Sequence, residues 1–231
     1  MISLKKSFSF IHHSLISLIV IALIAVAACG GDDDDGVTDS TYKPGEINLG
    51  DTGPGGGIIF YVADGLEGRP LGFTVEGYNG ATGSFASYTA HYLEVAPSDS
   101  SSSAKWGGSD TEISGVTTFL LDSDADAYKI GNGRKDTQII VAHLAANITE
   151  KDRAAQLAAG ADFGGKNDWF LPSSGELNLL YTSGISGITS GRFLSSSQHN
   201  IYYAWNQMFD DGTRNAVFKT FDYAVRAVRA F

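Results

Sequence analysis

The chain contains one cysteine, Cys29, so its fold cannot rest on an intrachain disulfide. Any stable structure must therefore come from a buried apolar core. The 186 residues from Glu46 to Phe231 contain no Pro/Ser-rich break longer than a loop. A chain of this length buries enough apolar surface to fold without covalent cross-links. We therefore predict one folded domain over residues 46–231.

The segment before this cysteine has the pattern of a targeting sequence. Lys5 and Lys6 supply positive charge, and Leu15–Val26 is an almost uninterrupted apolar run. The run is as long as the apolar region of a signal peptide, about 7–15 residues, and shorter than the ~20 residues that span a bilayer. Residues 1–28 are therefore predicted to be a signal peptide.

The four residues Val26–Cys29 (VAAC) resemble the lipobox of bacterial lipoproteins. The resemblance implies cleavage after Ala28 and a diacylglycerol group on Cys29. Acyl chains would anchor the domain to a membrane, because each buried methylene contributes about 0.8 kcal/mol. Two alternatives stay open: an uncleaved membrane anchor, and an ordinary secretory signal in which the cysteine is incidental.

Residues 29–45 are predicted to form a flexible tether. Asp32–Asp35 place four adjacent carboxylates in a stretch without an apolar face. The cluster resembles the surface-export signal of some bacterial lipoproteins, which implies an outer-membrane lipoprotein exposed at the cell surface. A plain spacer and a domain facing the periplasm are the alternatives. The formal net charge of −10 argues against nucleic acid as a partner, since phosphate binding needs clustered Lys and Arg.

The pattern along the rest of the chain predicts an α+β fold with a mixed or antiparallel sheet and two or three helices. Runs of β-branched and aromatic residues predict strands over 57–62, 91–95, 192–196, 202–209, 215–221 and 224–231. Helical spacing predicts helices over 137–146 and 152–159, and a capping box at Ser173–Glu176 predicts a third. The polar stretch 98–109 is predicted to be an exposed loop, and Asp210–Gly212 a hairpin turn.

Several segments share their order and content with one known family. They are Gly50–Tyr61 (GDTGPGGGIIFY), His91–Pro97 (HYLEVAP), Ile130–Gly133 (IGNG), Asp168–Leu177 (DWFLPSSGEL) and parts of Ser195–Phe231. Together they resemble the Lcl C-terminal-like domain, named after a bacterial collagen-like adhesin. The resemblance spans Leu49–Phe231 and implies a C-type-lectin-like fold, related to the formylglycine-generating enzyme group. Because the namesake adheres to glycans or matrix, it also implies recognition of a glycan or protein partner.

Gly53–Gly57 is a glycine run of the kind that can bind phosphate. In a P-loop, however, a strand precedes the glycines and Lys-Ser/Thr follows them. Here the strand follows the glycines and no lysine does. The run is therefore predicted to be a tight turn that leads into a buried strand.

Three carboxylates alternate as in a calcium loop: Asp122, Asp124 and Asp126. An EF-hand would need a glycine and a glutamate where the chain has Ala127 and Gly133, so a solvated acidic loop is the first interpretation and a calcium site the second. Calcium-dependent lectins of the implied fold use Glu-Pro-Asn or Gln-Pro-Asp with Trp-Asn-Asp. The chain lacks both triplets, and residues 204–207 (AWNQ) match only in part. No cofactor is predicted, with calcium as the alternative.

The sequence lacks the residue patterns of several enzyme classes. The copper oxidase chemistry of the formylglycine-generating relatives needs paired thiolates, and Cys29 is single. The histidines after the leader (His91, His143 and His199) have no His-x-x-x-His spacing, and Gly-x-Ser-x-Gly does not occur. We therefore predict that the protein is not an enzyme.

Stacking on a sugar ring needs an exposed aromatic side chain beside hydrogen-bonding groups. Trp106, in the polar stretch, is the best exposed candidate, with a loop that anchors its own aromatic as the alternative. Trp169 and Trp205 lie in apolar segments and are predicted to be core. Tyr202 and Tyr203 point to opposite faces of a strand, so at most one is buried. The other candidate ligand-binding residues are Tyr202, Asn206, Asp210 and Asp211.

Arg226 and Arg229 lie three residues apart, which places them on opposite faces of a strand. The inward one needs a carboxylate partner and is interpreted as structural, with a ligand-facing arginine as the alternative. The sequence as a whole predicts a membrane-anchored lipoprotein whose domain recognises a glycan or protein partner without catalysis. The alternative is a structural or assembly lipoprotein of the cell envelope.

Overall fold

The computed structural model of the chain describes residues 45–80, 82–147, 149–185 and 187–231. The predicted signal peptide, the predicted lipidation site Cys29 and the acidic cluster of the predicted tether lie outside these residues. Within them, none of the helices has the length and apolar character that crossing a membrane requires.

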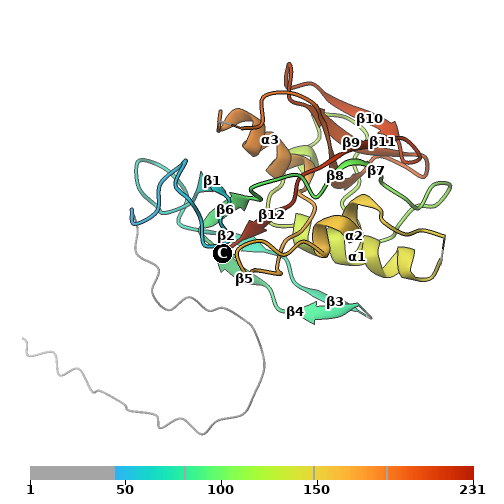
Figure 1. Ribbon diagram of the computed structural model, residues 1–231, viewed down its shortest axis with the longest axis horizontal. Coiled ribbons are helices and arrows are strands. Elements are labelled where there is room, and N and C mark those ends of the chain that lie inside the picture. Colours follow the sequence, from blue (N-terminus) through green and yellow to red (C-terminus); the bar gives the residue numbers. More distant parts are fainter. Residues whose placement is uncertain (1–44, 81, 148, 186) are drawn as a thin grey trace, which may run out of the picture. The chain divides into compact units, whose positions relative to one another are not determined.

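The described part of the chain is mixed α+β (Figure 1). Its helices are the 3-10 helix η1 (Ala125–Tyr128), α1 (Gly133–Ala145), α2 (Ala154–Ala159) and α3 (Ser174–Thr182). One antiparallel sheet has the strand order β1 (Ile58–Val62), β6 (Tyr92–Val95) and β12 (Val228–Ala230). A larger sheet has the order β10 (Arg214–Phe218), β9 (Tyr203–Met208), β8 (Arg192–Gln198), β11 (Asp222–Val225) and β7 (Ser101–Lys105). Two smaller antiparallel pairs are β2 (Phe73–Val75) with β5 (Tyr88–Ala90), and β3 (Tyr78–Gly80) with β4 (Gly83–Phe85).

The larger sheet separates two apolar cores. Neighbouring residues of a strand point to opposite faces, and β8 shows this at Phe193 and Leu194. Phe193 belongs to the core that contains Leu177 of α3, whereas Leu194 belongs to the core that contains Ile140 and Leu144 of α1. Helices α1 and α2 pack against each other, and Figure 1 shows them together and apart from α3.

Most of the predicted elements are present. The three helices form where the spacing and the capping box predicted them, although α1 begins earlier, at Gly133. The hydroxyl of Ser173 accepts the N–H of Glu176 at 3.1 Å, and the Glu176 carboxylate accepts the N–H of Ser173 at 2.8 Å. Strands β1, β6, β8, β9 and β10 also lie where strands were predicted. The α+β prediction is therefore confirmed.

Two predictions about the strands are wrong. The stretch 98–109 is not a loop, because residues 101–105 form β7 and pair with β11 at the edge of the larger sheet. An edge strand can expose one polar face, so its serines do not prevent pairing. The single strand predicted over 224–231 is two strands in different sheets: β11 pairs with β7 and β8, and β12 pairs with β6.

The glycine run forms the predicted turn into β1, and it wraps around a buried carboxylate. The N–H groups of Gly55 and Gly57 donate to Glu94 Oε1 at 3.0 and 2.8 Å. Arg229 Nη1 donates to Glu94 Oε2 at 3.2 Å, and Arg229 Nε donates to Asp168 at 2.8 Å. Arg229 is thus the buried arginine with carboxylate partners that the sequence predicted. Arg226 forms an ion pair with Asp99 at 2.6 Å.

Candidate functional site

Trp106 is buried, so the prediction that it is exposed to a ligand is wrong. Its side chain is 1% exposed, and its indole N–H donates to the carbonyl of Ser195 at 2.8 Å. Trp106 directly follows β7, and like Ala104 of that strand it belongs to the core that contains Ile140. The structure supports the alternative, in which this segment anchors its own aromatic side chain. Trp169 and Trp205 are in the core, as predicted.

Lys219 is a buried cation beside Trp106. Its side chain is 0% exposed, and its Nζ lies 4.6 Å from the centroid of the Trp106 ring. The ammonium donates to the Thr111 carbonyl at 2.9 Å and to Gln198 Oε1 at 2.8 Å, and among the described residues no carboxylate pairs with it. Burial lowers the pKa of Lys219 to about 8, against a smaller opposing effect of the Glu112 charge.

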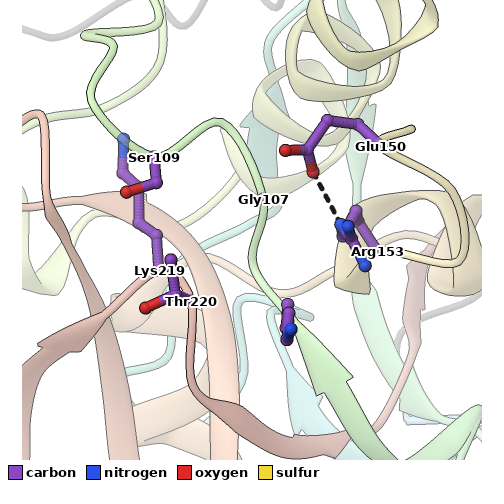
Figure 2. A pocket seen from close by; sticks show the side chains of 7 residues that line it. Gly107, Ser109, Glu150, Arg153, Lys219 and Thr220 are labelled. Carbon is purple, nitrogen blue, oxygen red and sulfur yellow. Dashed lines mark hydrogen bonds and ion pairs between the residues drawn. The ribbon is translucent and has the colours of Figure 1, made fainter. Parts of the chain in front are cut away.

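A pocket of about 230 Å³ opens next to Lys219 (Figure 2). It lies between the segment that leaves β7, the loop that precedes α2 and the turn that follows β10. The other lining residues are Lys105, Gly107, Ser109, Glu150, Arg153 and Thr220. Figure 2 shows Arg153 donating from Nε to Glu150, at 2.6 Å. The pocket therefore has three cationic side chains and one carboxylate, although the chain as a whole carries a formal charge of −10.

A group of neighbouring rings, which we call the aromatic row, lies on β9, on β10 and just after the turn that follows β10. It consists of Tyr203, Phe218 and Phe221. Tyr203 and Phe218 are cross-strand partners whose ring centroids are 4.4 Å apart, and Phe218 and Phe221 are 5.2 Å apart. The Phe221 N–H donates to the Phe218 carbonyl at 3.0 Å, which closes the turn containing Lys219 and Thr220. Phe218 is 44% exposed and Phe221 54%.

The candidate ligand-binding residues predicted on this hairpin do not converge. Tyr202 is exposed and Tyr203 half-buried, which fits the prediction that at most one of them is core. Asn206 is 1% exposed, so the prediction that it contacts a ligand at the surface is wrong. Asp210 and Asp211 are exposed but follow the opposite end of β9 from Tyr202.

The two aspartates instead hold turns. Asp210 Oδ2 accepts the N–H of Gly191 at 3.1 Å, and Asp211 Oδ1 accepts the N–H of Thr213 at 2.9 Å. Hydrogen bonds from Thr213 lower the pKa of Asp211, since they favour its charged form. Side chains of this kind stabilise turn backbones, which explains why Asp-Asp-Gly was recognisable as a turn.

The three aspartates of the predicted acidic loop each have a different partner. Asp122 forms an ion pair with Arg214 at 2.6 Å, and Asp126 forms one with Lys129 at 3.3 Å. Asp124 Oδ2 accepts the N–H groups of Leu120 and Leu121. Nowhere in the described ranges do three or more His, Cys, Asp or Glu side chains gather as metal ligands would. The calcium alternative therefore gains no support from this geometry.

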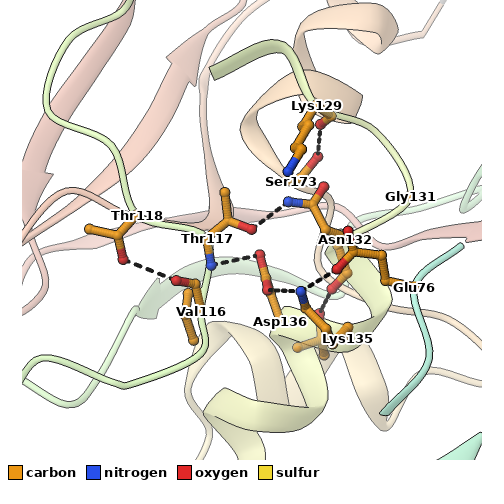
Figure 3. Close-up of polar contacts among 12 residues, drawn as sticks. Glu76, Val116, Thr117, Thr118, Lys129, Gly131, Asn132, Lys135, Asp136 and Ser173 are labelled. Atoms are coloured by element: carbon orange, nitrogen blue, oxygen red, sulfur yellow. Dashed lines mark hydrogen bonds and ion pairs between the residues drawn. The ribbon is translucent and has the colours of Figure 1, made fainter. Parts of the chain in front are cut away.

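A buried polar cluster at the start of α1 was missed from the sequence (Figure 3). Asp136 is fully buried, and its Oδ2 accepts the N–H of Thr117 at 3.2 Å. Its Oδ1 has no hydrogen-bond partner among the described residues and lies 4.0 Å from Lys135 Nζ. The available signal was helical spacing, because Asp136 is four residues before the core residue Ile140.

Burial raises the pKa of Asp136 to about 7, although the hydrogen bonds from Thr117 and the charge of Lys135 act in the opposite direction. Glu176 is also buried, and burial likewise raises its pKa. A raised pKa means that the folded state holds the proton more tightly than the unfolded state. The free energy of unfolding therefore falls as pH rises from the ordinary Asp value of 3.8 to about 7.

Asp136→Asn should remove this part of the pH dependence. Asparagine keeps an oxygen for the Thr117 N–H and carries no charge that burial could penalise. Between pH 5 and pH 8 the wild type should lose about 1–3 kcal/mol of unfolding free energy that the variant keeps. Urea unfolding at the two pH values measures this difference. The control Asp162→Asn, at an exposed position, should follow the wild type; equal behaviour of the two variants would contradict the prediction.

The chain matches no protein-family model and no curated protein. Among solved structures, a fimbrial protein from Bacteroides ovatus is similar at 15% identity and a TM-score of 0.45. The similarity covers 76% of this chain and 44% of that protein, so the chain spans less than half of the neighbour's length. At this TM-score the likeness carries no argument about function.

Proposed function

We propose that the chain is a bacterial surface lipoprotein whose folded part binds a saccharide through the aromatic row, without catalysis. The observation that carries this proposal is the exposure of neighbouring rings at the edge of the larger sheet. Phe218 and Phe221 are about half exposed and contact each other, and Tyr203 supports Phe218 from the next strand. Adjacent exposed rings commonly mark binding surfaces, and their flat apolar faces suit the C–H face of a sugar ring.

The resemblance to the Lcl C-terminal-like domain supports the same function and a C-type-lectin-like fold. Four of the resembling segments contribute to one buried network, in which Glu94 binds Gly55, Gly57 and Arg229, and Arg229 binds Asp168. These motif residues therefore stabilise the fold and leave the aromatic row as the surface that can vary with the ligand. In this proposal a lipid on Cys29 holds the domain at the outer membrane.

Phe218→Ala and Phe221→Ala should each weaken glycan binding at least about tenfold, which corresponds to ~1.4 kcal/mol. Each substitution removes a ring that a sugar would contact and disturbs no buried core. A glycan array followed by titration of the bound oligosaccharide measures the effect. Tyr128→Ala is the control, because Tyr128 is an exposed aromatic outside the row.

Two outcomes would contradict the saccharide proposal. One is retention of binding in both phenylalanine variants. The other is an array on which the wild-type chain binds no glycan, which would favour the structural or assembly lipoprotein as the function.

A further inference from the structure

The pocket beside Lys219 concentrates positive charge in an acidic chain. Its three cations face a single carboxylate, Glu150, which Arg153 already holds through Nε at 2.6 Å. Arg153 Nη2 donates to the Thr149 carbonyl, and within the described ranges Nη1 makes no hydrogen bond. Lys105 is half-buried and forms no ion pair with a described residue. The pocket therefore offers donors and positive charge that the protein itself does not neutralise.

Lys219 adds a buried positive charge to the lining of the pocket. Its ammonium is already hydrogen-bonded to three neutral oxygens, those of Gly108, Thr111 and the Gln198 side chain. It therefore acts on a bound group through its charge, not through a new hydrogen bond. Because the charge is buried without a carboxylate partner in the described part of the chain, an anion nearby would interact with it more strongly than in water.

The wall of the pocket is kept clear by a residue without a side chain. Gly107 has a φ of +88°, and a Cβ at this position would lie 2.9 Å from Arg153 Cγ and 3.1 Å from Glu150 Oε2. Ser109 and Thr220 place hydroxyl groups on the lining. The pocket is thus open beside the Arg153 side chain and has neutral donors and acceptors as well as charges.

Size and chemistry together select a ligand class. A volume of about 230 Å³ lies below the ~300–1,000 Å³ of most sites for drug-sized ligands, so one sugar-sized molecule fits and a long chain does not. The positive charges of the lining favour an acidic ligand, and the hydroxyl groups of Ser109 and Thr220 can form hydrogen bonds with the hydroxyl groups of that ligand. We infer that this pocket binds the carboxylate of a small sugar acid such as a hexuronic acid. Lys105 and Arg153 donate to the carboxylate, and Lys219 contributes its charge.

This site is separate from the aromatic row. Phe218 is the last residue of β10, and Lys219 is the first residue of the turn that follows it. The Phe218 ring is exposed, whereas Lys219 is buried against Trp106. The inference therefore does not depend on the proposed function, and each can fail without the other.

Calorimetric titration of the purified full chain with sodium glucuronate and with glucose, at fixed ionic strength, tests the inference. Glucuronate should bind at least about tenfold more tightly than glucose, because a charge-assisted contact is lost with the neutral sugar. Lys105→Gln should weaken glucuronate binding by about tenfold, and Lys105→Arg should largely preserve it. The matched control is Lys151→Gln, which makes the same change of charge at an exposed residue outside the lining.

Four results would overturn the inference. The first is that glucuronate binds no more tightly than glucose. The second is that Lys105→Gln weakens glucuronate binding no more than Lys151→Gln does. The third is that sulfate, at equal ionic strength, binds the pocket as tightly as glucuronate does, which would mean that the pocket binds any oxyanion. The fourth is that Phe218→Ala abolishes glucuronate binding, which would show that the aromatic row and the pocket are one site. We expect this variant to bind glucuronate as the wild type does.

Discussion

Glu94→Ala is expected to lower the free energy of unfolding by about 3–5 kcal/mol, the usual cost of breaking a buried ion pair from one side. Glu94 is fully buried and accepts hydrogen bonds from Gly55, Gly57 and Arg229. Without its carboxylate, the two glycine N–H groups lose their partner, and the buried Arg229 keeps only Asp168. Urea unfolding followed by tryptophan fluorescence measures the change.

Two further variants sharpen this test. Glu94→Gln keeps the shape and one acceptor but loses the charge, so its effect should lie between those of the wild type and Glu94→Ala. Glu46→Ala removes an exposed glutamate and should change the free energy of unfolding by less than about 0.5 kcal/mol. A Glu94→Ala variant as stable as Glu46→Ala would mean that the buried network does not stabilise the fold.

The elements that could be predicted from the sequence have local signals. The capping box at Ser173 and Glu176 involves residues three apart, and the turn at Asp210–Gly212 depends on adjacent residues. The Glu94 network has no such signal, because its partners lie 39 residues away at Gly55 and 135 residues away at Arg229. The sequence could predict that an inward arginine needs a carboxylate, but only the fold identifies which one.

The aromatic row, our proposed binding surface, could not be predicted from the sequence, because its arrangement depends on where the strands begin and end. The serine-rich composition around Trp106 outweighed the alternation of Ala104 and Trp106, which was the available sign of an inward strand face. A single strand over 215–221 would place Phe218 and Phe221 on opposite faces. In the structure β10 ends at Phe218, and the turn that follows brings the two rings together.

Gly57→Ala is expected to destabilise the fold by about 3 kcal/mol or more, at the upper end of the cost of overpacking. A Cβ on Gly57 would lie 1.9 Å from the carbonyl oxygen of Val95 and 3.1 Å from Glu94 Oε1. The first of these atoms is backbone in β6, so no side-chain rotation can relieve the overlap. The glycine run must then move away from β6, and the Gly57 hydrogen bond to Glu94 is lost with it.

The neighbouring Gly56 is a control that separates this overlap from backbone strain. Gly56 has a φ of +76°, and a Cβ there would meet no atom within 4 Å. Gly56→Ala should therefore cost only about 1–2 kcal/mol, the penalty of a left-handed backbone for an L-residue. In thermal and urea unfolding, the Gly57→Ala variant should be much less stable than the Gly56→Ala variant. The reverse order would mean that the glycines serve turn conformation and not the close approach to Glu94 and Val95.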